Sequence, residues 1–220
     1  MRLVCVCGLA AEARRARRSG LCPIVGAGDR ARTAALITAA GNGIDCLISF
    51  GIAGALAPLL QTGDVVISTE VVATGGSWRA PASFRRDIAG LADALGVHQG
   101  AVLGAPVILA TAEAKRQARD QTGAVAVDLE SDLVADGAAR AGIPFVVIRA
   151  IADPAARDLP PAALLPLAAN GTAQLPAVLA SLVHDPRQFG PLFTLARETR
   201  AALAALMRPA QALQRRLATA

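Results

Sequence analysis

Short, almost continuously apolar segments alternate with alanine-rich segments of helical spacing along most of this chain, and that alternation limits the folds open to it. We predict strands at residues 2–8, 21–25, 46–50, 64–69, 100–103, 107–110, 124–127 and 144–150. Helical patterns cover residues 29–40, 83–95, 112–121 and 131–141. A strand that is apolar on both faces needs cover on both faces. The pattern therefore predicts an α/β fold in which helices flank a central β-sheet.

The C-terminal third is predicted to be mostly helical and to follow a proline-rich loop. Prolines crowd residues 153–166, and prolines at 176, 186, 191 and 209 interrupt a helical tail over residues 168–217. No stretch resembles a linker, so we predict a single domain over residues 1–220, with an α/β core at 1–155 and a helical extension at 156–220. With five Phe, one Trp and no Tyr, its core must consist of Val, Leu, Ile and Ala.

Composition argues against several functional classes. No apolar run approaches the roughly 20 residues of a membrane-spanning helix, and the N-terminal run is too short for a signal peptide, so we expect a cytoplasmic protein. Four cysteines without disulfide or zinc spacing, and only two histidines, lead us to expect no metal site. The net charge of +5 comes from dispersed arginines without aromatic platforms, and we expect no nucleic-acid partner.

A glycine pattern at residues 25–31 has two interpretations. It follows a predicted strand and fits the G-x-G-x-x-A pattern of dinucleotide-binding turns, and Asp45 lies at the spacing of a ribose contact. Alternatively, it is only a tight turn between a strand and a helix. We favour the turn, because such patterns arise easily in an alanine- and glycine-rich chain and this one follows the second strand.

Small residues also follow the strand predicted at residues 46–50. The sequence there continues Gly51, Ile52, Ala53, Gly54, and a Gly-Asp-Val-Val-Ile-Ser segment begins at residue 63. α/β sheets bind ligands at the carboxyl ends of their strands, where small residues allow a flat ligand to approach the backbone. Close helix packing is the alternative explanation for these small residues.

Acidic residues follow the last two predicted strands. Asp128 and Glu130 lie between a strand and a helix, and Asp153 follows the strand at 144–150. Taken singly, Asp128 is typical of a helix cap and Asp153 of a turn before proline. Together they place three carboxylates at one edge of the predicted sheet.

The order of these motifs resembles that of the nucleoside phosphorylase and nucleosidase superfamily. The resemblance covers about residues 1–155 and rests on residues 8–12, 51–58 with 63–68, 128–131 and 149–153. It is closest to the methylthioadenosine/S-adenosylhomocysteine nucleosidase branch. The short length, the Gly-Leu-Ala-Ala-Glu-Ala start at residue 8 and the arginine-rich tail look like hopanoid-associated phosphorylases. The resemblance implies a mixed central sheet and a homo-oligomer.

The resemblance also implies roles for individual residues. Asp153 matches the aspartate that supplies a proton to adenine N7, and a partly desolvated site would help it hold that proton. Glu130 matches the glutamate that accepts hydrogen bonds from ribose hydroxyls. Glu12 falls where nucleosidases keep the acid that orients or deprotonates water. The remaining predicted substrate contacts are Gly51, Ala53, Gly54 and Leu129.

The sequence does not decide whether water or phosphate is the nucleophile. Related phosphorylases place phosphate-binding groups where this chain has Glu12, and Ile52 replaces the Ser or Thr of relatives, so a hydroxyl for phosphate is missing. Backbone amides at Ala53 and Gly54 are still expected to be available, and Arg14 or Arg15 could compensate the acid only by pointing inward. We expect no organic cofactor, and inorganic phosphate is retained as an open co-substrate.

The resemblance thus implies an enzyme that releases adenine from a 5′-substituted adenine nucleoside, with adenosylhopane as the leading substrate. The alternatives are a methylthioadenosine/S-adenosylhomocysteine nucleosidase and a nucleoside-binding protein without catalysis. Trp78 and Phe84 are either an apolar wall for the 5′ group or ordinary loop anchors. The basic, amphipathic tail either packs on its own domain or makes a peripheral contact with the inner face of the membrane, where it could meet a lipid-linked nucleoside.

Overall fold

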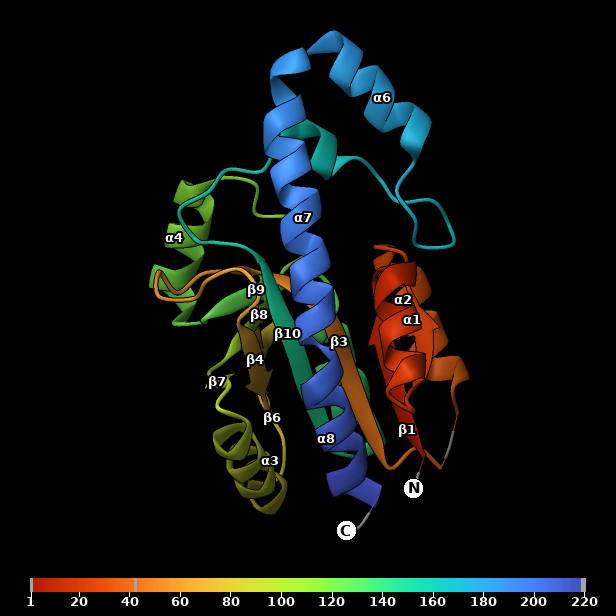
Figure 1. The fold of residues 1–220 in the computed structure, drawn as a ribbon. Helices are drawn as coiled ribbons and strands as arrows, with labels where there is room; N and C mark the ends of the chain where they lie inside the picture. Colours follow the sequence, from red (N-terminus) through yellow and green to blue (C-terminus); the bar gives the residue numbers. More distant parts are fainter. Residues whose placement is uncertain (1, 42, 219–220) are drawn as a thin grey trace.

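The computed structural model describes residues 2–41 and 43–218, and within them a ten-stranded mixed sheet forms the centre of the molecule (Figure 1). The strands are β1 (Leu3–Cys7), β2 (Cys22–Val25), β3 (Cys46–Ala55), β4 (Val65–Ser68), β5 (Glu70–Ala73), β6 (Gly76–Arg79), β7 (His98–Gln99), β8 (Val102–Gly104), β9 (Ala126–Asp128) and β10 (Phe145–Asp153). Their order is β6-β5-β8-β9-β3-β10-β4-β7, and β1 joins β2 to β3. The predicted fold class is confirmed.

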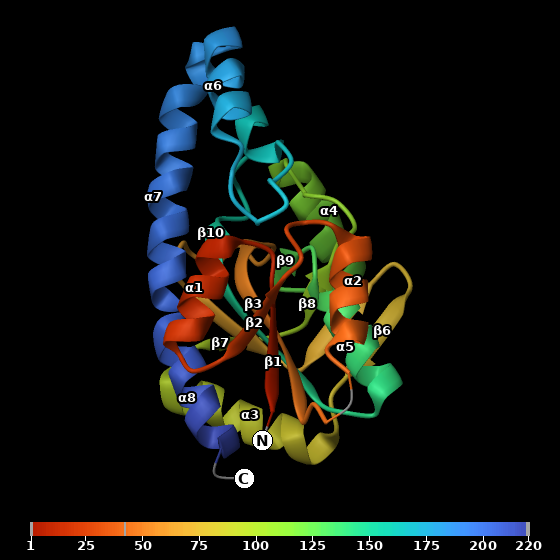
Figure 2. The ribbon, with the colours of Figure 1, turned by 90° about the vertical axis from the view of Figure 1, so that its right-hand side faces the viewer.

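Helices cover both faces of this sheet (Figure 2). Helices α1 (Ala10–Arg18), α3 (Ala82–Leu95), α7 (Phe189–Ala205) and α8 (Met207–Ala218) lie on one face, and α2 (Arg30–Ala39) and α5 (Ser131–Ala141) lie on the other. The third group of helical segments, at the periphery of the sheet, is α4 (Ala112–Thr122), α6 (Leu175–His184) and the 3-10 turns η1 (Pro161–Leu164) and η2 (Pro186–Gln188).

Alternation along the central strands explains the two layers. In β10, Val146 and Ile148 belong to the core under α7 and α8, whereas Phe145 and Val147 belong to the core under α5. Successive side chains of a strand point to opposite faces, so a continuously apolar strand supplies both cores. This is the burial on both sides that the apolar runs predict.

The C-terminal helices complete the first of these cores. Leu203, Leu206, Leu213 and Leu217 are buried in it, next to strands β3 and β10. Helix α7 ends at Ala205 and α8 begins at Met207, so Pro209 lies in the first turn of α8, where its missing N–H costs no helical hydrogen bond. The helical tail is interrupted two or three residues before this proline. The apolar face formed by these four leucines therefore packs on its own domain.

Several boundaries differ from the predictions. Strand β3 continues to Ala55, because β9 and β10 pair with its glycine-rich end. The strand predicted at 107–110 is wrong: these residues form an irregular segment in which Val107 and Ile108 are exposed. Sequence reasoning also missed α1 and the short strands β5, β6 and β7. These strands are only two to four residues long, and β6 and β7 contain few apolar residues, so their pairing depends on neighbours in the sheet.

The glycine pattern at residues 25–31 forms the turn between β2 and α2. Ala27 and Gly28 have positive φ values of 59° and 74°, and Asp29 caps the helix by accepting a hydrogen bond from the backbone N–H of Arg32. Asp45 accepts a hydrogen bond from the backbone N–H of Arg2, at the start of β3. The turn interpretation fits this geometry.

Of the helices in the described part of the chain, none is both long enough and apolar enough to cross a membrane.

Truncating a buried leucine of α8 tests the packing of the tail. Leu213 is fully buried, so Leu213→Ala should lower the free energy of unfolding by about 2–5 kcal/mol, through lost apolar burial and the cavity left behind. Leu179→Ala in α6 is the matched control, because Leu179 is 61% exposed and its truncation should cost about 0.5 kcal/mol or less. Urea unfolding of both variants measures the difference. Equal stabilities would contradict the packing of α8 on the sheet.

Candidate active site

A cavity of about 760 Å³ opens at the carboxyl ends of the parallel strands β1, β3 and β10. Six of the seven predicted site residues line it: Glu12, Ala53, Gly54, Leu129, Glu130 and Asp153. The structure thus brings together acids that lie far apart in the sequence. Its volume is within the range of small-molecule sites.

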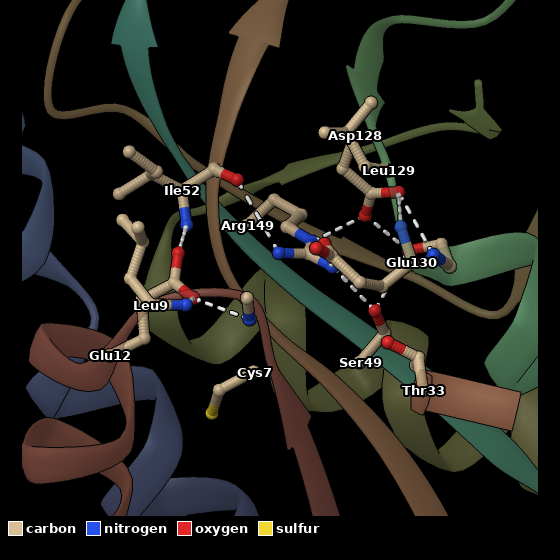
Figure 3. A network of polar contacts seen from close by, with 12 residues as sticks. Cys7, Leu9, Glu12, Thr33, Ser49, Ile52, Asp128, Leu129, Glu130 and Arg149 are labelled. Atoms are coloured by element: carbon tan, nitrogen blue, oxygen red, sulfur yellow. Dashed lines mark hydrogen bonds and ion pairs between the residues drawn. The ribbon is translucent and has the colours of Figure 1, made fainter. Parts of the chain in front are cut away.

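Glu12 is buried at the N-terminal end of α1 and is held by backbone donors (Figure 3). Its Oε2 accepts hydrogen bonds from the N–H groups of Gly8 and Leu9 at 2.9 and 2.8 Å, and its Oε1 accepts one from Ile52 at 2.8 Å. Burial raises the pKa of Glu12, and Arg149 and the three hydrogen bonds act against that rise. The side chain therefore has one fixed orientation at the cavity wall.

Arg149 is the centre of the polar network in Figure 3. Its side chain, 1% exposed, forms an ion pair with Asp128 at 2.5 Å, donates a hydrogen bond to Ser49 Oγ at 2.6 Å and lies 3.5 Å from Glu130 Oε2. Burial lowers the pKa of Arg149, but the carboxylates of Asp128, Glu130 and Glu12 outweigh burial and raise it. The guanidinium is thus a permanent positive charge beneath two of the cavity's acids.

Asp128 is buried and stabilises the turn that leads into α5. It accepts hydrogen bonds from the N–H groups of Glu130 and Ser131 and from the Ser131 hydroxyl, at the start of α5. Ser131 Oγ in turn contacts Ser49 Oγ at 2.9 Å. This capping fixes the direction in which Glu130 leaves the backbone.

Arg30, at the start of α2, holds the same turn from the other side. It forms a two-pronged ion pair with Asp132 and donates a hydrogen bond to the carbonyl of Leu129 at 2.9 Å. Leu129 and Glu130 are therefore positioned by arginines from two separate elements, α2 and β10.

The ionisation of Glu130 is shifted into the neutral range. Burial raises its pKa to about 7, and the carboxylates of Asp128, Glu12 and Asp132 add to the rise, whereas Arg149 opposes it. A carboxyl group with a pKa near 7 changes charge in the neutral range.

Asp153 ends β10 and pairs with a buried lysine. Lys115, 1% exposed, donates hydrogen bonds to Asp153 Oδ2 at 2.5 Å and to the carbonyls of Pro154 and Arg157 at 3.1 and 2.9 Å. These bonds use all three donors of its ammonium group. Burial raises the pKa of Asp153 above its usual range, and Lys115 works against that rise.

Glycines make room for the acids. A Cβ at Gly8 would lie 2.5 Å from Glu130 Oε1, and one at Gly51 would lie 2.3 Å from Glu12 Oε1 and 2.6 Å from Arg149 Nη1. Gly51, the seventh predicted contact, therefore lies below the cavity rather than in its wall. At Gly54 a Cβ would lie 3.1 Å from Asp153 Oδ2. Side chains at these positions would displace the carboxylates.

Acidic groups dominate the polar lining. Of the described residues that line the cavity, Lys115 is the one with a basic side chain, and it is bound to Asp153. Arg14 is exposed and Arg15 half-buried, and neither lines the cavity. Ala53 and Gly54, whose amides were expected to be available, are part of β3 and pair with β9 and β10. The arrangement suits a neutral or cationic ligand better than an anion.

The rest of the cavity wall is apolar and comes from segments after β10. Leu159, Leu165, Leu167, Val178, Leu192 and Leu195 line it, together with Leu109 before α4. Trp78 and Phe84 do not; they pack against the hydrophobic core, which agrees with their interpretation as anchors. The cavity thus has a carboxylate-lined end and an aliphatic end.

Sequence reasoning missed the roles of Arg149 and Lys115. Lys115 is the chain's single lysine, but its surroundings in the sequence, Glu-Ala-Lys-Arg-Gln, are typical of an exposed helix. Arg149 interrupts an otherwise apolar strand, and a charged residue inside a buried strand is a signal that it has a partner.

Known proteins resemble the chain in sequence. The 5′-methylthioadenosine/S-adenosylhomocysteine nucleosidases of Actinobacillus succinogenes and Maridesulfovibrio salexigens are 33% and 30% identical to it over 129 and 135 residues. These matches cover 50% and 52% of this chain and 56% and 58% of the relatives. The chain therefore spans little more than half the length of these relatives.

Solved structures resemble the fold. The 5′-methylthioadenosine/S-adenosylhomocysteine nucleosidase of Helicobacter pylori matches with a TM-score of 0.71 and 12% identity, covering 100% of this chain and 99% of its own. The futalosine hydrolase of the same organism matches with a TM-score of 0.67 and 13% identity, covering 100% and 96%. A model of the phosphorylase superfamily matches residues 3–180. With most of its sequence inside that match, the chain belongs to the phosphorylase superfamily.

Proposed function

We propose that this chain is an enzyme that hydrolyses the N-glycosidic bond of a 5′-substituted adenine nucleoside and releases adenine. One observation carries the proposal: Glu12, Glu130 and Asp153 line one cavity whose other end is aliphatic. Cleavage of this bond requires a proton for the departing base, stabilisation of a positively charged sugar and a nucleophile. The three carboxyl groups match these three requirements. The sequence relatives, which are named as nucleosidases, support the assignment.

Asp153 is the proposed acid for the base. Burial raises its pKa, which favours the protonated form, and Lys115 fixes Oδ2 so that the carboxyl group has one orientation. As the bond between the sugar C1′ and the base nitrogen breaks, the Asp153 proton moves to N7 and the base leaves as neutral adenine.

Glu130 is the proposed partner of the ribose. A carboxylate that accepts hydrogen bonds from the sugar hydroxyls gains interaction energy as positive charge develops on the ring. The capped turn after β9 and the two arginines keep it at the cavity wall.

Glu12 is the proposed base for a water molecule, and water rather than phosphate is the proposed nucleophile. A phosphate ion next to Glu12 would be repelled, and the described cavity wall offers no unpaired cation to compensate. In hydrolysis the water oxygen bonds to C1′ and Glu12 takes a water proton. The missing hydroxyl at Ile52 agrees with this choice.

The aliphatic end favours a large apolar 5′ group. Adenosylhopane, which the family resemblance suggests, combines an adenine nucleoside with such a group and is our leading substrate. Methylthioadenosine and S-adenosylhomocysteine are the second candidates, supported by the names of the relatives. A binding protein without catalysis would have no need for three carboxyl groups in a desolvated wall.

Adenine release from a series of 5′-alkylthioadenosines tests the activity and the 5′ preference together. We expect adenine with or without phosphate in the buffer. The value of kcat/KM should rise about fourfold for each methylene added to the 5′ chain until the aliphatic end is full, because each buried methylene contributes about 0.8 kcal/mol.

The control for this experiment is Asp153→Asn, which should lower kcat about 100- to 10,000-fold while binding is retained. Asp87→Asn on exposed α3 should have no effect. Adenine that appears only with phosphate would contradict hydrolysis, and no adenine from any nucleoside would contradict the enzyme. A rate that falls with chain length would favour a methylthioadenosine nucleosidase.

The pH dependence of kcat/KM tests Glu130. Its pKa of about 7 lies above that of an ordinary carboxyl group, so Glu130 is neutral below this pH and charged above it. Because the charged form stabilises the sugar, kcat/KM should rise with pH through a midpoint near 7. Glu130→Gln should remove this limb and lower the plateau about 10- to 100-fold. An unchanged limb in Glu130→Gln would assign it to another group; Glu113→Gln, exposed on α4, is the control.

A further inference from the structure

Helix α6 contains no Asp, Glu, Lys or Arg, and yet none of its residues is buried. Its sequence is Leu-Pro-Ala-Val-Leu-Ala-Ser-Leu-Val-His. Leu175, Leu179 and Val183 recur every four residues and are 68%, 61% and 83% exposed. A helix that is apolar on all sides is usually buried in a protein core or in lipid. In the described chain nothing apolar covers the exposed side chains of α6, and exposed apolar patches of this kind often mark an interaction surface.

The first turns of α7 continue this exposed apolar surface. Phe189 and Phe193 are 67% and 59% exposed, and with helical spacing they share one face with Arg197 and Arg200, which are also exposed. The face changes from aromatic to basic along α7. Phe189 and Arg197 are eight residues apart, which corresponds to about 12 Å along a helix.

We name residues 175–200 the α6–α7 hairpin, and it projects beyond the rest of the molecule (Figures 1 and 2). The turn between its helices, at η2, is the far end of the projection. Leu175 also lines the cavity, as do Val178, Leu192 and Leu195 of the same hairpin, whereas Leu179 and Val183 do not. The hairpin is thus a thin apolar wall with the cavity on one side.

The distribution of charged residues indicates what kind of partner covers the outer side of the α6–α7 hairpin. Between residues 159 and 196 the charged residues are Asp185 and Arg187, and beyond them Arg197 and Arg200 follow on α7. The nearby acid Glu198 is already paired with Arg157. The hairpin of a second copy would therefore offer these arginines little negative charge, whereas anionic lipid headgroups would complement them.

We propose that the α6–α7 hairpin docks on an anionic phospholipid bilayer. Leu179, Val183, Phe189 and Phe193 enter the boundary between headgroups and acyl chains, and Arg197 and Arg200 contact the headgroups. The depth of about 5–10 Å that interfacial helices reach is compatible with the spacing between the aromatic and basic parts of α7. The docked hairpin would place the aliphatic end of the cavity at the bilayer surface; this consequence for substrate delivery rests on the proposed function, whereas docking itself does not.

Sedimentation of the full chain with lipid vesicles tests the docking. We expect binding to vesicles of phosphatidylcholine mixed with phosphatidylglycerol and weaker binding to phosphatidylcholine alone. Val183→Glu and Phe193→Ser should each weaken binding to mixed vesicles at least about tenfold. Arg197→Gln should weaken it about fivefold on mixed vesicles and leave it unchanged on neutral ones. Leu59→Glu is the control, because Leu59 is exposed in the loop after β3 and should not matter.

Other outcomes would overturn the proposal. Wild-type protein that stays in the supernatant, or variants that bind like wild type, would contradict docking. Self-association that Val183→Glu abolishes, without vesicle binding, would assign the hairpin to a second copy. Adenine release from a soluble nucleoside, measured without vesicles, should be unchanged in Val183→Glu. Vesicle binding without any adenine release would leave the docking in place and contradict only the proposed function.

Discussion

The buried positive charge of Arg149 is the interaction on which the site depends. Its guanidinium faces Asp128 and Glu130 and lies close to Glu12 across Gly51. Carboxylates so close to one another would otherwise repel and take up protons, and burial alone would keep them neutral. Removing one partner of a buried ion pair leaves an uncompensated charge, which costs several kcal/mol. One strand residue thus allows several acids to share a desolvated wall and still differ in ionisation.

Pairing with a buried cation also makes the two regions of the acidic wall differ from each other. Arg149 interacts with the carboxylates of Asp128, Glu130 and Glu12, and Lys115 forms its ion pair with Asp153. Two independent cations give the two regions different proton affinities, so one carboxyl group can remain protonated while its neighbour is charged. Aliphatic residues from η1, α6 and α7 then close the remaining side of the cavity. In the proposed reaction, the carboxyl groups at one end of the cavity stabilise the reacting sugar and base, and the aliphatic residues at the other end bind the apolar part of the substrate.

Much of this arrangement could be predicted from sequence, for physical reasons. Parallel strands share their carboxyl edge, so acids after β1 and β10 had to lie near one another, although 141 positions separate Glu12 from Asp153. The extension of β3 to Ala55 could not be predicted, because pairing with β9 and β10 outweighs the weak strand preference of its glycines. The segment at 107–110 has strand-like composition but no strand partner. Lys115 lies in a polar helical pattern, and only the tertiary fold places its ammonium group beside Asp153.

The most direct test of the central claim is a crystal structure with an adenine nucleoside analogue that cannot be cleaved. The account predicts that the base lies against Asp153 with N7 within hydrogen-bond distance of its carboxyl group, and that the sugar hydroxyls face Glu130. A water molecule should lie between Glu12 and C1′, and the 5′ group should point toward the α6–α7 hairpin. An analogue bound elsewhere, or bound with its base away from Asp153, would contradict the assignment of these three acids to one reaction.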